Sequence, residues 1–269
     1  MSSGDITGVS AQPPHRYVEV DGQVPTNGEL ASLLFDNYGH FTAMQVRDGK
    51  TRGLDLHAER LVRQHHDVFG EPLDTDLVLA FAEQALIGHP NASVRIVLTH
   101  GPHVTVLVDP PADVPSTPMR LKTVVTERHL PHVKHLGTFM QRHHAAQAIA
   151  GGADDALFVT AEGSVLESSV WNIGFVFDST AVFPDGPRLH GITEHLLRRH
   201  APEGGIRVSQ RSVELSDVSQ AQGAFLTNSW GVVPVAAIDA TCWSQVHDLV
   251  RELITLYREL PVSHVGPKA

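Results

Sequence analysis

Lysine is scarce in this chain, and the scarcity singles out one lysine for covalent chemistry. The 269 residues contain four lysines, at positions 50, 122, 134 and 268, against sixteen arginines. A Schiff base with a carbonyl compound requires a primary amine that can lose its proton, which arginine cannot do. Lys134 alone stands at a turn-rich junction between a predicted strand and a predicted helix. Although most single lysines are solvated surface charges, elimination and context make Lys134 the candidate.

A carboxylate stands thirty-three positions after Lys134, in a segment rich in β-forming residues. Val165-Leu166-Glu167 is followed five positions after the glutamate by Asn172. Taken alone, Glu167 would be an ordinary surface residue of a strand. Together with Lys134, it is the second candidate for chemistry.

These stretches resemble the class IV (fold type IV) pyridoxal-phosphate enzymes, which include branched-chain and D-amino-acid aminotransferases and aminodeoxychorismate lyase. The resemblance covers roughly residues 35–240 and includes four further features. These are a His-x-x-Arg-Leu signature at 57–61, a Leu-x-Gly-Ile-Thr turn at 189–193, a late loop at 225–229, and Val-Pro-Val at 233–235. It implies a mixed α/β (α+β) fold of two domains, with pyridoxal 5′-phosphate in the cleft between them and a homodimer completing the site.

The resemblance also implies a role for each matched residue. Lys134 would form the Schiff base with the cofactor and move the proton, and Glu167 would keep the pyridine nitrogen protonated. A phosphate dianion favours a helix N-terminus together with a cation. The residues implied to hold the phosphate are Arg60, Ile192, Thr193 and Ser229.

The substrate side departs from the family's pattern. Phe139 replaces a tyrosine that branched-chain members often have, while His100 and Glu194 stand where arginine is common. Substrate carboxylates are normally recognised in these regions. The remaining candidates for that contact are Tyr38, His40 and Arg128.

The predicted function is a pyridoxal-phosphate aminotransferase that moves an amino group between an amino donor and a 2-oxo acid. An aminodeoxychorismate lyase, which eliminates pyruvate, is the nearest enzyme alternative. Three features favour it: Lys134-His135-Leu136, Phe41-Thr42 and the Asn228-Ser229 loop. A non-catalytic binding protein of the same fold is an alternative of another class, although loss of the lysine or glutamate would be expected there. A histidine-rich metal protein is a third, but the histidines at 129, 132 and 135 lack clustered carboxylate or cysteine partners, so no metal site is predicted.

Composition narrows the setting. The formal net charge of −10 disfavours nucleic-acid binding. The N-terminus lacks the basic and apolar runs of a signal peptide, and no apolar run approaches the ~18 residues of a membrane span. The single cysteine, Cys242, excludes an intrachain disulfide. These observations predict a cytoplasmic protein without a membrane or nucleic-acid partner.

The elements that must position these residues fall into two halves. We expect a flexible arm over 1–15, a small α/β domain over 16–110, a linker over 111–118 and a larger α/β domain with the lysine over 119–269. In the first half we expect a strand at 17–20, a hairpin of 41–47 with 51–56, helices near 55–69 and 75–86, and strands at 93–99 and 103–108. In the second half we expect helices at 138–150, 191–200, 215–221 and 244–260, and strands at 119–126, 156–160, 164–168, 171–177, 181–183, 206–213, 224–227 and 232–238. The helix at 138–150 is expected to bury Phe139, Met140, His143, Ala146 and Ile149.

Overall fold

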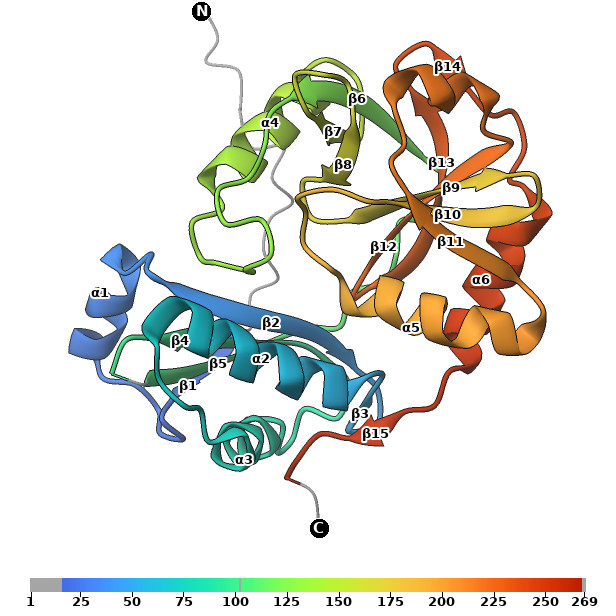
Figure 1. Cartoon of the computed structure of the whole chain (residues 1–269). Helices are drawn as coiled ribbons and strands as arrows, with labels where there is room; N and C mark the ends of the chain where they lie inside the picture. The colour runs from blue at the N-terminus through green and yellow to red at the C-terminus, as the bar shows by residue number, and fades with distance from the viewer. Residues whose placement is uncertain (1–15, 102, 268–269) are drawn as a thin grey trace, which may run out of the picture.

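The computed structural model describes residues 16–101 and 103–267 (Figure 1). The predicted arm at 1–15 and Lys268 lie outside the described residues. The elements of the first half are β1 (Tyr17–Val20), α1 (Asn27–Phe35), β2 (Gly39–Val46), β3 (Lys50–Thr51), α2 (Leu54–Phe69), α3 (Thr75–Ala85), β4 (Ala92–Thr99) and β5 (His103–Asp109).

The second half contains a larger set of strands and helices. Its elements are β6 (Met119–Val125), α4 (Phe139–Ala150), β7 (Asp155–Val159), β8 (Val165–Ser168), β9 (Asn172–Phe177), β10 (Thr180–Pro184), α5 (Ile192–His200), η1 (Ala201–Gly204), β11 (Arg207–Arg211), η2 (Leu215–Gln220), β12 (Gly223–Asn228), β13 (Gly231–Ile238), β14 (Thr241–Cys242), α6 (Asp248–Glu259) and β15 (Ser263–His264). The mixed helix and strand content that the sequence predicts is confirmed.

The first half forms an antiparallel sheet of four strands in the order β1-β5-β4-β2. Alternate residues of a strand point to opposite faces. Met44 and Val46 of β2 therefore join the core beneath α2 and α3, whereas Phe41, Ala43 and Gln45 face the other side. That second face looks toward the other half of the molecule (Figure 1).

The second half forms a mixed sheet of nine strands that closes on itself. Its path runs β11-β10-β9-β12-β13-β6-β7-β8, with β14 on β13, and β8 returns to pair with β9. The closing pair is Glu167 opposite Asn172. Helices α5 and α6 pack together through a core that includes Leu197, Phe225 and Leu253. The closure places Glu167 at the strand end nearest the first half.

The last residues of the chain return to the first half. β15 pairs with β3, and the buried Val265 belongs to the core under the four-stranded sheet (Figure 1). The sequence analysis places this segment with the second half, because sequence position alone does not reveal a returning strand.

Three local predictions are wrong or incomplete. The second arm of the hairpin is only Lys50–Thr51, because Gly53 (φ 64°) turns the chain and α2 begins at Leu54. Helix α1 is absent from the prediction. Helix α4 is where it was expected, but it exposes Phe139 and Ile149 and buries Gln141 and Ala148.

Candidate active site

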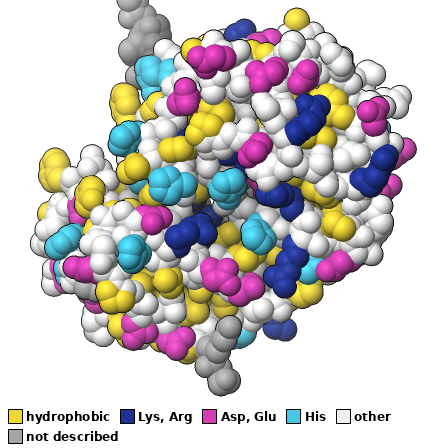
Figure 2. Space-filling view, in the orientation of Figure 1, with side chains coloured by type: hydrophobic (Ala, Val, Ile, Leu, Met, Phe, Trp, Pro, Cys, Tyr) yellow, Lys and Arg dark blue, Asp and Glu magenta, His cyan; other side chains and the backbone are white. Residues whose placement is uncertain are grey.

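A cavity of about 1100 Å³ lies where the two halves meet. Figure 2 shows basic and histidine side chains gathered along this junction. Seven of the nine residues predicted for the site line the cavity: Arg60, Arg128, Lys134, Glu167, Ile192, Thr193 and Ser229. Residues separated by more than 160 positions in the sequence thus share one site.

Lys134 is held by the first half although it belongs to the second. Its carbonyl accepts a hydrogen bond from the Phe41 N–H at 2.9 Å, and its own N–H donates to Oε1 of Gln64 at 3.1 Å. The ammonium lies 4.8 Å from the centre of the Phe41 ring. Burial, with the charges of Arg60 and Arg128, lowers the pKa of Lys134 to about 7. A large fraction of this amine is therefore neutral and nucleophilic near pH 7.

Glu167 is a buried carboxylate in which only one oxygen is hydrogen-bonded to the protein. Its Oε1 accepts from Nη1 of Arg128 at 3.0 Å and from the Leu189 N–H at 3.3 Å. Its Oε2 has no hydrogen-bond partner among residues 16–101 and 103–267. Burial raises the pKa of Glu167, and the adjacent guanidinium opposes that rise. The free oxygen can accept a hydrogen bond from a ligand N–H, and its negative charge would stabilise a cationic ring nitrogen.

Arg128 is occupied by protein contacts. Besides Glu167, its terminal nitrogens donate to the carbonyls of Pro131 at 3.1 Å and Val133 at 2.7 Å. The guanidinium therefore ties Glu167 to the segment that leads into Lys134. Nη1 makes two of these contacts and Nη2 only one, so the role of Arg128 in binding the substrate carboxylate stays a prediction.

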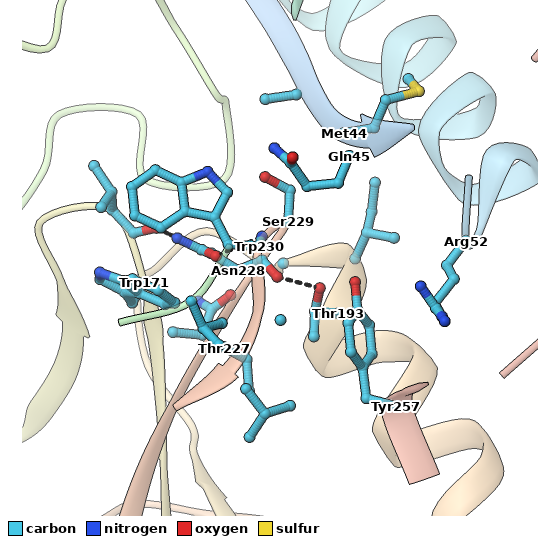
Figure 3. Close-up of a pocket in the computed structure, with 18 of the residues that line it drawn as sticks. Met44, Gln45, Arg52, Trp171, Thr193, Thr227, Asn228, Ser229, Trp230 and Tyr257 are labelled. Atoms are coloured by element: carbon cyan, nitrogen blue, oxygen red, sulfur yellow. Dashed lines mark hydrogen bonds between the residues drawn. The ribbon is translucent and has the colours of Figure 1, made fainter. Parts of the chain in front are cut away.

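The N-terminus of α5 opens toward the cavity without a side-chain cap. A Cβ built on Gly191 would overlap Oδ1 of Asn172, so a larger residue at this N-cap would displace the Asn172 side chain. Thr193 donates its hydroxyl to the Asn228 carbonyl at 2.6 Å, which joins the helix to the loop bearing Ser229 (Figure 3). Free N–H groups and the helix dipole make such a terminus attractive to an anion.

Arg60 is a buried cation without a counter-charge. It is 5% exposed and forms no ion pair with any described residue. One terminal nitrogen donates to the Thr42 hydroxyl, while Nε has no partner among these residues. Burial and the nearby Arg63 lower the pKa of Arg60 to about 9. A buried charge is normally paired, so an anion from outside the chain is the expected partner.

The Thr42 hydroxyl also fixes the neighbouring imidazole. It lies 2.6 Å from Nδ1 of His57 and already accepts from Arg60. A hydroxyl has one proton and two lone pairs, so the Thr42 hydroxyl can donate to Nδ1 or accept from it, according to the tautomer of His57. Burial holds the pKa of His57 well below its usual range, which favours the neutral imidazole.

Two predicted substrate residues do not reach the cavity. Tyr38 is 62% exposed, and its hydroxyl donates to the Val68 carbonyl at 3.0 Å. His40 is fully buried, with Nε2 3.4 Å from Nδ1 of His65, and burial lowers its pKa to about 3. The alternation along β2 explains why His40 lies away from the cavity, since its neighbour Phe41 occupies the cavity face.

Arg95 lies in the site although it is not among the predicted site residues. This arginine lines the cavity opposite Ala43 in the β2–β4 register and stacks 5.0 Å from the Phe41 ring. It forms no ion pair with the described residues. Glu194, which stands where arginine is common in the family, forms a buried ion pair with Arg188 at 2.7 Å. Phe41 and Ala43 lie on the cavity face of β2, and a residue paired with Ala43 on the neighbouring strand lies on the same face. A predicted β2–β4 register could therefore have identified Arg95.

No group of three or more histidine, cysteine, aspartate or glutamate side chains suited to a metal ion occurs among the described residues. Within the same part of the chain, no helix combines the length and apolar character needed to cross a bilayer.

This fold and site define a class of enzyme. The chain belongs to the amino-transferase class IV family, whose model matches residues 39–238. A probable branched-chain-amino-acid aminotransferase from Rickettsia typhi is 28% identical over 80% of this chain and 84% of its own length. The branched-chain-amino-acid aminotransferase of Pseudomonas aeruginosa is 33% identical over a shorter match, 35% of this chain and 31% of its own length.

Solved structures share the fold. The branched-chain aminotransferase of the archaeon Thermoproteus uzoniensis, solved with norvaline, superposes with a TM-score of 0.77, at 22% identity, over 90% of this chain and 93% of that one. A 4-amino-4-deoxychorismate lyase from Pseudomonas aeruginosa gives a TM-score of 0.76 at 25% identity, over 90% and 98%. The fold type IV prediction is confirmed.

Enzymes of this family use pyridoxal 5′-phosphate, and the residues present fit that cofactor. The unpaired Arg60 and the uncapped α5 suit a phosphate dianion. The free oxygen of Glu167 suits a protonated pyridine nitrogen, and Lys134 has a pKa that suits attack on an aldehyde.

Proposed function

We propose that this chain catalyses transamination between an amino donor and a 2-oxo acid, with Lys134 as its catalytic residue. One observation carries the proposal. A lysine of depressed pKa, a buried carboxylate with a free oxygen and an unpaired arginine beside an open helix terminus line a single cavity. Each feature suits a different part of one cofactor.

The phosphate would lie at the start of α5. Ile192 and Thr193 would donate their backbone N–H groups, Arg60 would supply the charge, and Ser229 would add its hydroxyl. Charge-assisted hydrogen bonds are about twice as strong as neutral ones. Arg60 should therefore contribute more to cofactor affinity than any one neutral donor.

Lys134 and Glu167 would share the chemistry. The bound cofactor acts as an electron sink for the bond that is broken at the substrate α-carbon. Lys134 would take the proton from the α-carbon and deliver it to the cofactor's C4′ carbon, and a neutral amine near pH 7 can accept that proton. Glu167 would hold the proton on the ring nitrogen, and Arg128 would hold Glu167 in place.

Arg95 is our first candidate for the substrate carboxylate and Arg128 is a second, whereas Tyr38 and His40 do not line the cavity. Its guanidinium and the Lys134 ammonium contact the same ring, so the distance between them cannot exceed the sum of 5.0 and 4.8 Å. That span suits a small amino acid with its amine at Lys134 and a carboxylate at Arg95. Arginine binds a carboxylate with two parallel hydrogen bonds.

The experiment that tests this function is spectroscopic. Purified protein with pyridoxal 5′-phosphate should show an imine absorbance band, and an amino donor without a 2-oxo acid should convert it to the pyridoxamine form. No band, or a band that no L- or D-amino acid changes, would refute transamination. The lyase alternative, supported by the fold shared with the Pseudomonas aeruginosa lyase, predicts pyruvate release without accumulation of that form.

Two further expectations belong to this proposal. We propose a homodimer, since exposed apolar side chains such as Phe35 and Phe139 remain on the surface of the single chain. Sedimentation or light scattering would test it. The cytoplasmic location stays a prediction from the sequence.

A further inference from the structure

Two tryptophans form an aromatic wall in the cavity that the proposed reaction does not explain. Trp171 and Trp230 both line the cavity and meet edge to face, with ring centres 5.3 Å apart (Figure 3). Trp171 is 4% exposed and belongs to the core, whereas Trp230 remains 40% exposed. A large aromatic side chain that stays open toward a cavity offers a binding surface for another ring.

The Trp230 turn is held in place. The Trp230 N–H donates to Oδ1 of Asn228 at 2.7 Å, and the same amide side chain donates to the Val170 carbonyl at 3.5 Å. These bonds connect the turn between β12 and β13 to the residue that precedes Trp171. The indole is therefore mounted on two connected turns rather than on a free loop.

The linker places this turn close to the sheet that carries Arg95. Ala112 donates its N–H to Oε1 of Gln45 at 2.9 Å, and Val114 lies 3.2 Å from where a Cβ of Gly231 would be. Two residues span at most about 7 Å. Trp230, next to Gly231, therefore lies near Gln45 and lines the same cavity as Arg95, which pairs with Ala43 two positions before Gln45 on β2.

We infer that the substrate carries a planar aromatic ring, which packs against Trp230 while Arg95 binds a carboxylate. The inference rests on the proposed function and specifies its substrate class. An indole attracts a planar ring through stacked or edge-to-face contact, which a saturated ring cannot reproduce. A merely apolar wall would favour the saturated ring, because it is the more hydrophobic of the two.

The test uses two unreactive acids of nearly equal size, 3-phenylpropanoate and 3-cyclohexylpropanoate. Their binding to holoenzyme is measured by quenching of tryptophan fluorescence in a Trp243→Phe background. Trp243 does not line the cavity and donates Nε1 to the Ala221 carbonyl at 2.8 Å, so this background leaves the aromatic wall intact. The second protein adds Trp230→Leu, and competition with an amino donor measures binding independently of fluorescence.

We expect the phenyl acid to bind about five-fold more tightly than the cyclohexyl acid, and Trp230→Leu to abolish the difference. Equal binding of the two acids, or discrimination that survives Trp230→Leu, would overturn the inference. A halved mass of Trp230→Leu in light scattering would also overturn it, because the indole would then contact a second copy. Absence of the imine band is a separate result that counts against the proposed function, and the acids still report on Trp230 in that case.

Discussion

Replacing Arg60 by methionine should stabilise the apoprotein and weaken cofactor binding, two effects of opposite sign. The guanidinium is 5% exposed, and no carboxylate among the described residues pairs with it. Its pKa falls from 12.5 to about 9 chiefly because burial penalises the charge. At ~1.4 kcal/mol for each tenfold change, keeping Arg60 charged costs roughly 5 kcal/mol in the absence of an anion.

Methionine fills much of the same volume without the charge. Removing the charge relieves the cost of roughly 5 kcal/mol, but the substitution also loses packing contacts and the hydrogen bond to Thr42. We therefore expect the unfolding free energy of the apoprotein to rise by only about 1–2 kcal/mol. Loss of two charge-assisted bonds to phosphate, at ~1.5–3 kcal/mol each, should weaken cofactor binding by about 10²–10⁴-fold.

The assay is urea unfolding of the apoprotein together with titration by pyridoxal 5′-phosphate. The matched control is Arg63→Met, on the exposed side of the same helix. It should change both quantities far less than Arg60→Met, because the charge of an exposed arginine is screened by solvent. An Arg60→Met apoprotein destabilised by several kcal/mol, with unchanged cofactor affinity, would show that Arg60 is a structural residue and not a phosphate ligand.

Three further predictions concern catalysis, the substrate and pH. Glu167→Gln should retain bound cofactor yet lose turnover by at least ten-fold, since an amide stabilises a protonated ring nitrogen less well; near-normal turnover would remove Glu167 from the mechanism. Arg95→Gln should raise KM for the amino donor about ten-fold or more and leave the imine band unchanged, and an unchanged KM would reject the carboxylate contact. Buried His40 has a pKa of about 3 in the folded protein against 6.5 when unfolded, so the unfolded state takes up the proton first as the pH falls. The contribution of His40 to the unfolding free energy is therefore constant above about pH 6.5 and has fallen by roughly 2 kcal/mol at pH 5. Urea midpoints should fall less steeply with falling pH for His40→Phe than for wild type, and parallel slopes would contradict the assignment.

Capping residues, turns and the spacing of apolar residues predicted most helices and strands. The exceptions have identifiable physical causes. Helix α1 was detectable, because Thr26 and Glu29 form a capping box, a recognisable sequence signature. The buried side of α4 was not, since its apolar residues are spread around the helix and tertiary packing selects Gln141 and Ala148. A left-handed glycine at position 53 starts α2, a geometry that ordinary capping patterns do not describe.

The cofactor side of the site was predictable where the substrate side was not. Lys134, Glu167 and the turn at Gly191 belong to contiguous motifs that the sequence displays directly. Arg95 and Trp230 are single residues whose importance depends on which face of a sheet they occupy and what lies opposite. The contact of Arg128 with Glu167 was not predictable, because it joins residues 39 positions apart that share no local motif.

The most direct test of the account is to identify the lysine that forms the imine. Holoenzyme is reduced with borohydride, digested, and mapped by mass spectrometry. The depressed pKa of Lys134 and its place in the cavity predict that the label falls on Lys134 alone. A label on Lys122, which is paired with Asp239 at 2.7 Å outside the cavity, or no label on any lysine, would contradict the assignment.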